Sequence, residues 1–147
     1  MDALDRLIRD LKNLDASART GVIDNERNAS KLLWQELGTE NAPARPTLSA
    51  TTDRLAPSID RAIKRRVGLV LDGKVHTTGQ EILADLARDL QEEVVAQIND
   101  DTTPELAEST KAARRRKGLD NRTLVETGDM RDAITVQVKA NSKPWLD

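Results

Sequence analysis

The apolar residues of this chain recur at two different periods, and this change of period restricts the fold more than any other feature. Two long stretches carry apolar residues three and four positions apart, the spacing of one face of an α-helix. The first has Leu55, Ile59, Ile63, Val67, Val70 and Leu71, and the second has Ile82, Leu83, Leu86, Ala87, Leu90, Val94 and Ile98. Near the C-terminus the period becomes two, and Ile134, Val136 and Val138 alternate with polar residues, as in a half-buried strand. The sequence therefore predicts an α+β fold, with a small antiparallel sheet packed against a helical hairpin.

Local signals predict where the two long helices begin and end. We expect the first over residues 53–71, with Pro57 in its first turn, where a missing N–H costs little. We expect the second over residues 78–98, with Thr77 or Thr78 as its cap and Glu81 placed to complete a capping box. The short connection between them favours an antiparallel hairpin.

Three shorter elements precede this hairpin or follow it. Residues 2–15 predict an amphipathic N-terminal helix whose apolar stripe consists of Leu4, Leu7, Ile8, Leu11 and Leu14. We expect this stripe to face the core, and the alternative is that it docks onto a neighbouring subunit. Residues 17–25 predict a short strand, and residues 28–38 predict a short helix that carries Trp34, as a core or interface aromatic. Residues 99–122 predict a long polar loop, in which residues 109–116 could become helical on binding a partner. Residues 140–147 predict a C-terminal tail, and all these elements belong to one domain of residues 1–147.

The composition limits both the core and the chemistry. Among 147 residues there is no Phe, Tyr or Cys, so aliphatic side chains must form almost the whole core, and disulfides are excluded. His76 is the single histidine, and no nucleophile elbow, phosphate-binding loop or metal-ligand spacing accompanies it. We therefore expect no enzyme activity, no cofactor and no metal. No apolar run approaches the roughly 18 residues that a membrane span needs, so we expect a soluble protein with no membrane partner.

Two short motifs combine turn chemistry with charge. In the first, Glu36-Leu37-Gly38-Thr39 is followed by Pro43-Ala44-Arg45-Pro46, which predicts a glycine turn and then a rigid extended segment. In the second, the run Arg114-Arg115-Arg116-Lys117-Gly118 leads into Thr127-Gly128-Asp129-Met130-Arg131 and the alternating strand. Here Gly128 permits a positive φ, and Asp129 is placed to cap a short helical turn.

These motifs resemble those of tailed-bacteriophage neck and tail-completion proteins, often labelled minor tail or virion-morphogenesis proteins. That family has E-F-G-T, then I-P-A-R-P-F, and later R-K-G leading into P-L-I/V-D-T-G-x-M/L-R-x-S-I-x-Y/V-x-V. The matching residues here include Glu36, Gly38, Thr39, Pro43, Arg45, Pro46, Arg116, Lys117, Thr127, Gly128, Met130 and Arg131. The chain departs from the pattern at Leu37, Thr47, Thr123, Glu126 and Ala133. The resemblance covers roughly residues 28–139 and leaves out the N-terminal helix.

The resemblance implies a structural subunit of the phage neck, a tail-completion or gateway ring between the head connector and the tail that lines the DNA path. Its partners would be copies of itself in a closed hexamer or dodecamer, a head-completion or adaptor protein, and a tail-terminator or tail-tube protein. DNA in the lumen would make transient, non-specific contacts, and the subunit, assembled in the host cytoplasm, would reside in the virion. Contact residues would be Glu36, Gly38, Thr39, Pro43, Arg45, Pro46, Thr127, Gly128, Met130, Arg131 and, as a docking anchor, Trp145. On this basis Arg45→Ala or Gly128→Val should block assembly and leave the monomer soluble.

Clustered cations support an alternative of a different class. Six basic residues and one acidic residue lie within residues 111–122, so this run could contact phosphates in a small DNA-binding regulator. The net charge of −2 and the scarcity of stacking aromatics disfavour that alternative. Residues that could face DNA or a partner are Arg61, Lys64, Arg65, Arg66, Lys111, Arg114, Arg115, Arg116 and Lys117.

Overall fold

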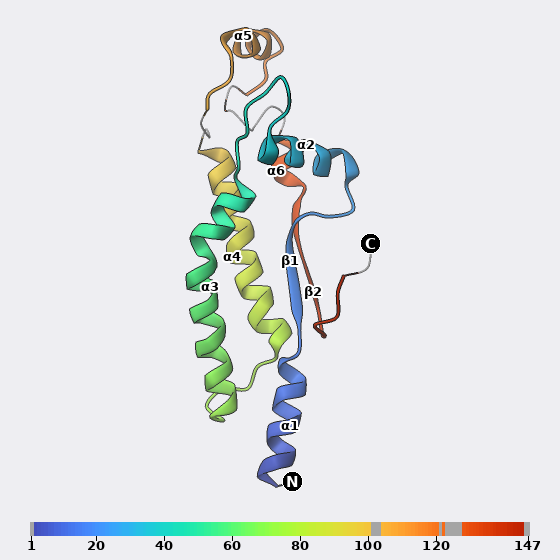
Figure 1. Cartoon of the computed structure of the whole chain (residues 1–147), viewed down its shortest axis with the longest axis vertical. Helices are drawn as coiled ribbons and strands as arrows, with labels where there is room; N and C mark the ends of the chain where they lie inside the picture. The colour runs from blue at the N-terminus through green and yellow to red at the C-terminus, as the bar shows by residue number, and fades with distance from the viewer. Residues whose placement is uncertain (1, 101–103, 121, 123–127, 146–147) are drawn as a thin grey trace. The chain divides into compact units, whose positions relative to one another are not determined.

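The structure is a computed structural model that describes residues 2–100, 104–120, 122 and 128–145. These residues form six helices and two strands (Figure 1). In chain order they are α1 (Ala3–Leu14), β1 (Ser17–Val22), α2 (Glu26–Leu37), α3 (Leu48–Leu71), α4 (Gly79–Asn99), α5 (Glu108–Arg116), α6 (Asp129–Asp132) and β2 (Ile134–Lys139). The strands pair in one antiparallel sheet, and the predicted α+β class is confirmed.

The chain divides into two compact units. Unit 1 comprises residues 1–20, 55–89 and 136–147, and unit 2 comprises residues 21–54 and 90–135. The helices α3 and α4 and both strands contribute residues to both units. Each unit is therefore assembled from segments that lie far apart in the sequence.

The helices α3 and α4 run antiparallel, as predicted. In unit 2, Arg54 of α3 donates to Glu93 of α4 at 3.0 Å, and in unit 1, Arg66 of α3 donates to Asp85 of α4 at 3.2 Å. Later residues of α3 thus face earlier residues of α4. Because all four side chains are at least about a third exposed, these ion pairs add little stability, but they record the direction of the two helices.

The predicted start of the first long helix was wrong. The helix α3 begins at Leu48, five residues before the expected start, so Pro57 lies in its interior instead of its first turn. The signal that starts α3 is a carboxylate from α2, described below, which no local cap pattern reveals. The other ends follow the sequence signals. Gly73 follows α3 with a φ of 71°, and Thr78 and Glu81 form the expected capping box at the start of α4.

Side-chain hydrogen bonds in unit 1 link the two strands to each other and to α4. The guanidinium of Arg19 on β1 donates to the side-chain oxygen of Gln137 on β2, at 3.0 and 2.7 Å. The hydroxyl of Ser17 donates to the carbonyl of Asn141 at 2.8 Å, just beyond β2. The hydroxyl of Thr20 donates to the carbonyl of Ala87 at 3.1 Å, which fastens β1 to α4 within unit 1.

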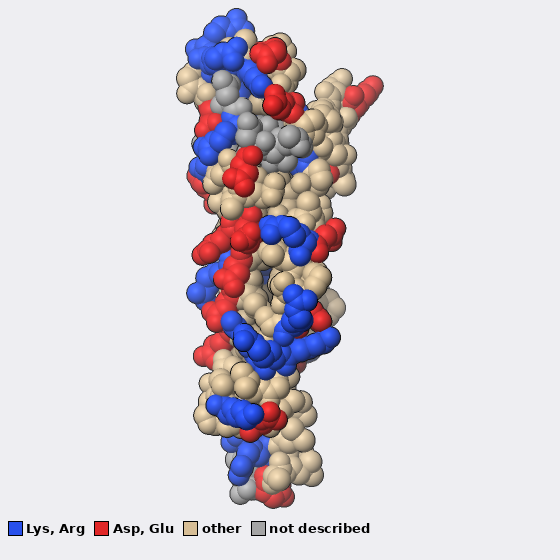
Figure 2. Space-filling view, turned by 90° about the vertical axis from the view of Figure 1, so that its left-hand side faces the viewer, with Lys and Arg blue, Asp and Glu red and all other residues tan. Residues whose placement is uncertain are grey.

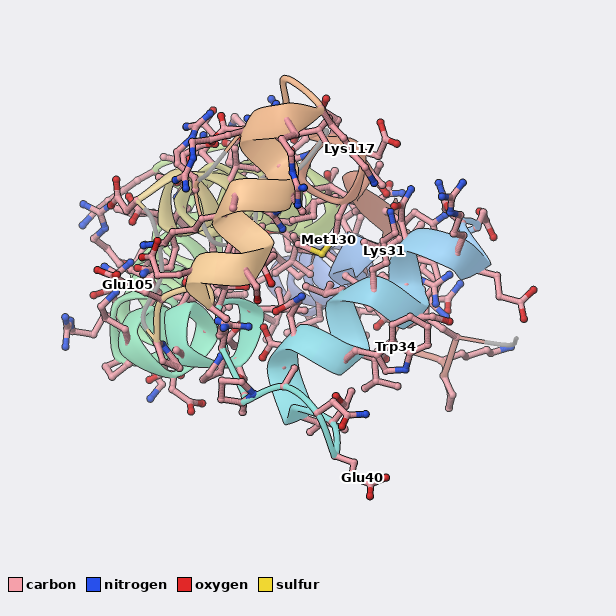
Figure 3. All side chains as sticks on the ribbon, turned by 90° about the horizontal axis from the view of Figure 1, so that it is seen from above. Lys31, Trp34, Glu40, Glu105, Lys117 and Met130 are labelled. Carbon is pink, nitrogen blue, oxygen red and sulfur yellow. The ribbon has the colours of Figure 1, made fainter. Side chains whose placement is uncertain are left out.

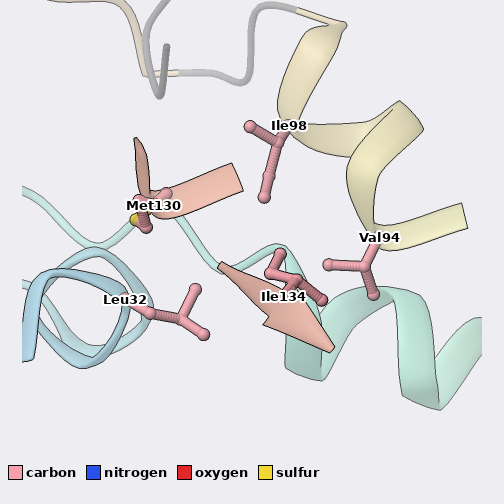
Figure 4. Packing of buried hydrophobic residues seen from close by; sticks show 5 residues of the cluster. All are labelled: Leu32, Val94, Ile98, Met130 and Ile134. Atoms are coloured by element: carbon pink, nitrogen blue, oxygen red, sulfur yellow. The ribbon is translucent and has the colours of Figure 1, made fainter. Parts of the chain in front are cut away.

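Aliphatic side chains and one methionine form the described core, as the composition predicted. In unit 2 the buried cluster is Leu32, Val94, Ile98, Met130 and Ile134, from α2, α4, α6 and β2 (Figure 4). In unit 1 the buried apolar residues are Val70, Ile82, Leu86 and Ala87.

One expectation about a single element was wrong. The helix α1 forms with Asp2 as its N-cap, accepting from the Asp5 N–H at 2.8 Å, but none of its residues is buried. Its stripe therefore does not face a core within the described chain. Within the predicted polar loop of residues 99–122, the helix α5 coincides with the stretch 109–116 that the sequence allowed to become helical on binding a partner.

Candidate assembly interface

The carboxylate of Glu36, near the end of α2, caps the N-terminus of α3. One of its oxygens accepts from the N–H groups of Thr47 and Leu48, both at 2.7 Å, and the other accepts from the N–H of Ser49 at 3.2 Å. The hydroxyls of Thr47 and Ser49 donate to it as well. The first N–H groups of a helix lack intrahelical acceptors and carry partial positive charge, so a carboxylate is well placed there. The first motif thus joins α2 to α3.

The same contacts lower the pKa of the Glu36 carboxyl. Partial burial raises the pKa, but hydrogen bonds from the Ser49 hydroxyl and from the N–H groups of residues 47–49 outweigh that effect. The pKa lies below its ordinary value of 4.5, so the carboxylate is ionised at neutral pH.

Gly38 forms the turn after α2, as the motif predicted. Its φ is 75°, and a Cβ placed there would come within 2.8 Å of the Ala44 nitrogen and 3.1 Å of the Ala42 oxygen. Thr39 and Ala42 form an isolated antiparallel bridge across the loop. Thr39, Pro43 and Pro46 are exposed on it. The glycine is required both by backbone conformation and by the close return of the chain.

Arg45 is buried in unit 2, with 5% of its surface exposed. Its guanidinium donates to the carbonyls of Pro104 at 2.6 Å and Glu105 at 3.1 Å, and its N–H donates to the Gln35 carbonyl at 2.6 Å. The side chain therefore links the first motif to the segment before α5. Its contacts are internal, and a direct role for Arg45 at a subunit contact stays a prediction.

The second motif caps the helix α6 and connects it to the end of α4. Gly128 is the N-cap of α6, in the left-handed region at a φ of 87°, so Asp129 is the first helical residue and not the cap we expected. The Arg131 guanidinium donates to the side-chain oxygen of Asn99, the last residue of α4, at 3.0 Å. Thr127, which was also expected to make contacts, lies outside the described residues.

The two motifs meet in the core of unit 2. Leu32 of α2, four residues before Glu36, packs in the same buried cluster as Met130 of the second motif (Figure 4). The structure thus brings together segments about 90 residues apart in unit 2. Trp145 belongs to unit 1.

Trp145 packs against its own sheet. Its ring centre lies 4.4 Å from the Arg19 guanidinium and 4.5 Å from the Lys139 ammonium. Cations at these distances over an indole face are attracted to it. The predicted docking on another subunit is untested, and within the chain the indole already has partners.

The basic residues of α3 are mostly paired. Lys64 forms an ion pair with Asp60 at 2.8 Å, Arg66 pairs with Asp85, and Arg61 donates to the Ser58 hydroxyl at 3.2 Å. The ion pair with Asp60 raises the pKa of the fully exposed Lys64. Arg65 is exposed beside them.

The basic residues of α5 split into two groups. Lys111 pairs with Glu105 at 3.1 Å, and Arg114 donates to the carbonyls of Asp120 and Arg122 at 3.2 and 2.9 Å. These two hold the helix to the segments on either side of it. The exposed residues are Arg115, Arg116 and Lys117, and Figure 2 shows blue atoms gathered over α5.

A tight turn follows α5. The Arg122 guanidinium and N–H both donate to the Asp120 carboxylate, the shortest contacts being 2.7 Å. These hydrogen bonds from Arg122 lower the pKa of Asp120 to about 2. The carboxylate of Asp120 is therefore ionised at neutral pH.

Two apolar helix faces are exposed, one on α2 and one on α1. On α2, Leu32 is buried together with Asn28, whereas Leu33, Trp34 and Leu37 are 55%, 56% and 72% exposed. Figure 3 shows Trp34 at the periphery of α2, whereas Met130 lies among the helices. On α1, Leu4, Leu7, Ile8 and Leu11 are 41–63% exposed. The helical spacing predicted both faces, but spacing alone does not say whether a face is covered.

Within the described residues, no helix is both long and apolar enough to cross a membrane. The same residues contain no group of three or more His, Cys, Asp or Glu side chains placed to hold a metal ion. Comparison with protein-family models, with curated proteins and with solved structures finds no match to this chain.

Proposed function

We propose that this chain is a non-enzymatic structural subunit of a phage neck, a tail-completion ring between the head connector and the tail. Its partners are copies of itself in a closed ring and the head and tail proteins on either side. The observation that carries the proposal is the joint role of the two motifs on which the resemblance rests. Both build unit 2, and their glycines occupy positions that a side chain would disturb.

Exposed apolar surface supports an assembly role. Monomeric soluble proteins rarely leave contiguous apolar patches uncovered, and such patches commonly mark protein contacts. This chain carries one such face on α1 and another on α2. In a ring, each subunit presents different surfaces to its two neighbours, and the contacts close on themselves.

The test is the mass of the purified protein by light scattering, alone and with the connector protein of the same phage, followed by electron microscopy. We expect closed rings of six or twelve subunits on the connector. Failure to bind the connector, together with normal virions that lack the protein, would reject the proposal.

A DNA-binding regulator is a second candidate, favoured by the three exposed cations at the end of α5. A regulator would retard DNA by itself, and its affinity would fall steeply with salt. One variant has Gln in place of Arg115, Arg116 and Lys117. The matched control variant has Gln in place of Arg61, Lys64 and Arg65. Loss of tight retardation in the first variant alone would favour the regulator. A neck subunit should bind DNA weakly, without sequence preference, in all three proteins.

A further inference from the structure

We propose that the exposed part of the α1 stripe, Leu4, Leu7, Ile8 and Leu11, binds the same four residues of a second copy, with the two helices antiparallel. The inference concerns the free protein and does not depend on the proposed function. It starts from the orientation of α1 in unit 1. Arg6, Arg9, Asp10 and Asn13 on its polar side line an open cavity of about 640 Å³ with the α3–α4 connection. The apolar side of α1 is left exposed.

The spacing of the stripe is the same in both directions along the helix. Leu4, Leu7, Ile8 and Leu11 are separated by three, one and three residues. An antiparallel copy centred between Leu7 and Ile8 therefore sets Leu4 against Leu11 of the second copy. In the same way, Leu7 of one copy lies opposite Ile8 of the other. All four exposed aliphatic side chains of each stripe are covered at once, which favours this register over shifted ones.

The charged residues Asp5 and Lys12 beside the stripe also fit an antiparallel pair. Asp5 and Lys12 lie on one flank, both are exposed, and neither forms an ion pair within the described chain. In an antiparallel symmetric pair, each flank of one helix lies beside the same flank of the other helix. Asp5 then lies about 3 Å along the axis from Lys12 of the second copy, within reach of the lysine side chain. On the other flank, Asp10 is already paired with Arg9 at 3.0 Å.

The contact should be weak because it is small. Four aliphatic side chains from each copy form less than the usual interface, which buries roughly 1,200–2,000 Å². We therefore expect a monomer–dimer equilibrium that depends on concentration. The substitution Leu7→Asp should raise the dissociation constant about tenfold or more, because it sets a charge among aliphatic side chains.

Single cysteines test the register, since the chain contains none of its own. In the proposed pair, residue 7 is offset from its own symmetry mate by about 1.5 Å along the axis, and residue 4 by about 10 Å. A disulfide cannot span the larger offset. On oxidation, Leu7→Cys should cross-link to itself. Leu4→Cys should not, except when mixed with Leu11→Cys.

Other outcomes overturn the proposal. Self-cross-linking of all three variants would mean a parallel pair. Cross-linking of Leu7→Cys to Leu37→Cys, and not to itself, would mean that α1 binds the α2 face of the next copy. No cross-link in any mixture, with a monomeric mass at the highest concentration, would mean that a second copy does not cover the stripe.

A charge exchange tests the flank independently. Alone, Lys12→Glu and Asp5→Lys each place like charges opposite one another and should weaken the dimer. Mixed together, they restore both opposite-charge contacts, so the mixed pair should bind more tightly than either variant by itself. Equal affinity in all three samples would overturn the antiparallel register. Circular dichroism of each variant checks that α1 is intact.

Discussion

At the scale of single residues, the motif side chains act mainly by joining segments of unit 2. Glu36 closes a helix to which it does not belong, and Arg45 fastens the loop to the segment before α5. Gly128 leaves room for Arg131, since a Cβ there would meet its guanidinium at 2.6 Å. The substitutions Arg45→Ala and Gly128→Val should therefore loosen unit 2 itself, in addition to any loss of assembly.

The substitution Glu36→Gln should lower the free energy of unfolding by about 1–2 kcal/mol at neutral pH, the usual effect of losing a helix cap. Because the folded-state pKa is depressed, this contribution is present above the ordinary pKa of 4.5. It is lost as the pH falls through the lower folded-state value. Urea unfolding of both proteins at pH 7 and at successively lower pH measures it. Glu40→Gln, at an exposed position on the same loop, is the matched control and should be near neutral. A difference that does not shrink in acid would contradict the capping role of the charge.

The substitution Gly38→Ala should destabilise the protein more than Gly73→Ala. The two glycines have nearly equal φ values, 75° and 71°, so left-handed strain of about 1–2 kcal/mol applies to both. Only Gly38 has backbone atoms inside the space that a Cβ would fill. The melting temperatures of the two variants separate the cost of the left-handed backbone, which both share, from the steric clash of the added Cβ, which only Gly38→Ala has. Equal losses would mean that the loop moves aside freely.

At the scale of elements, α3 combines a distant cap with two weak points. Its first residues are closed by Glu36, its interior contains Pro57, and Gly68 lies in its last third. Proline removes a backbone donor, and glycine gains more freedom on unfolding than other residues do. The helix therefore depends on packing and on its cap more than on local propensity.

The substitution Gly68→Ala should stabilise α3 by about 0.5–1 kcal/mol. No atom lies within 4 Å of the Cβ that it would add, and its φ is not in the left-handed region. Gly79→Ala is the opposite case, since its Cβ would overlap the Leu14 carbonyl, and it should destabilise unit 1. Denaturant midpoints of the two variants should move in opposite directions. A shift of both midpoints in the same direction would contradict the open space at Gly68 or the close backbone contact at Gly79.

At the scale of the whole molecule, a small aliphatic core coexists with exposed aliphatic faces. The absence of Phe and Tyr reduces the area that each buried side chain can contribute. Leucines that could enlarge a core instead lie exposed on α1 and α2. Association would cover this surface, and binding between folded copies adds to apparent stability by mass action.

The melting temperature should therefore rise with protein concentration if α1 pairs as proposed. In Leu7→Asp that dependence should weaken or vanish, while the melting temperature at low concentration stays close to that of the parent, because Leu7 is 43% exposed. Calorimetry across a hundredfold range of concentration makes the comparison. A concentration-independent melting temperature in the parent protein would contradict the pairing.

Local pattern by itself determined the kinds of element, because helix and strand periods and turn chemistry belong to neighbouring residues. It placed α4 and its capping box, the strand after residue 133, and the glycine turns at Gly38 and Gly128. Only the tertiary structure decided where α3 begins, because its capping carboxylate comes from another helix. It alone decided that Arg45 and Trp145 have partners within the chain, and that the stripe of α1 is exposed. Burial and capping across long separations depend on which segments meet, and a helical stripe has the same sequence whether or not it is covered.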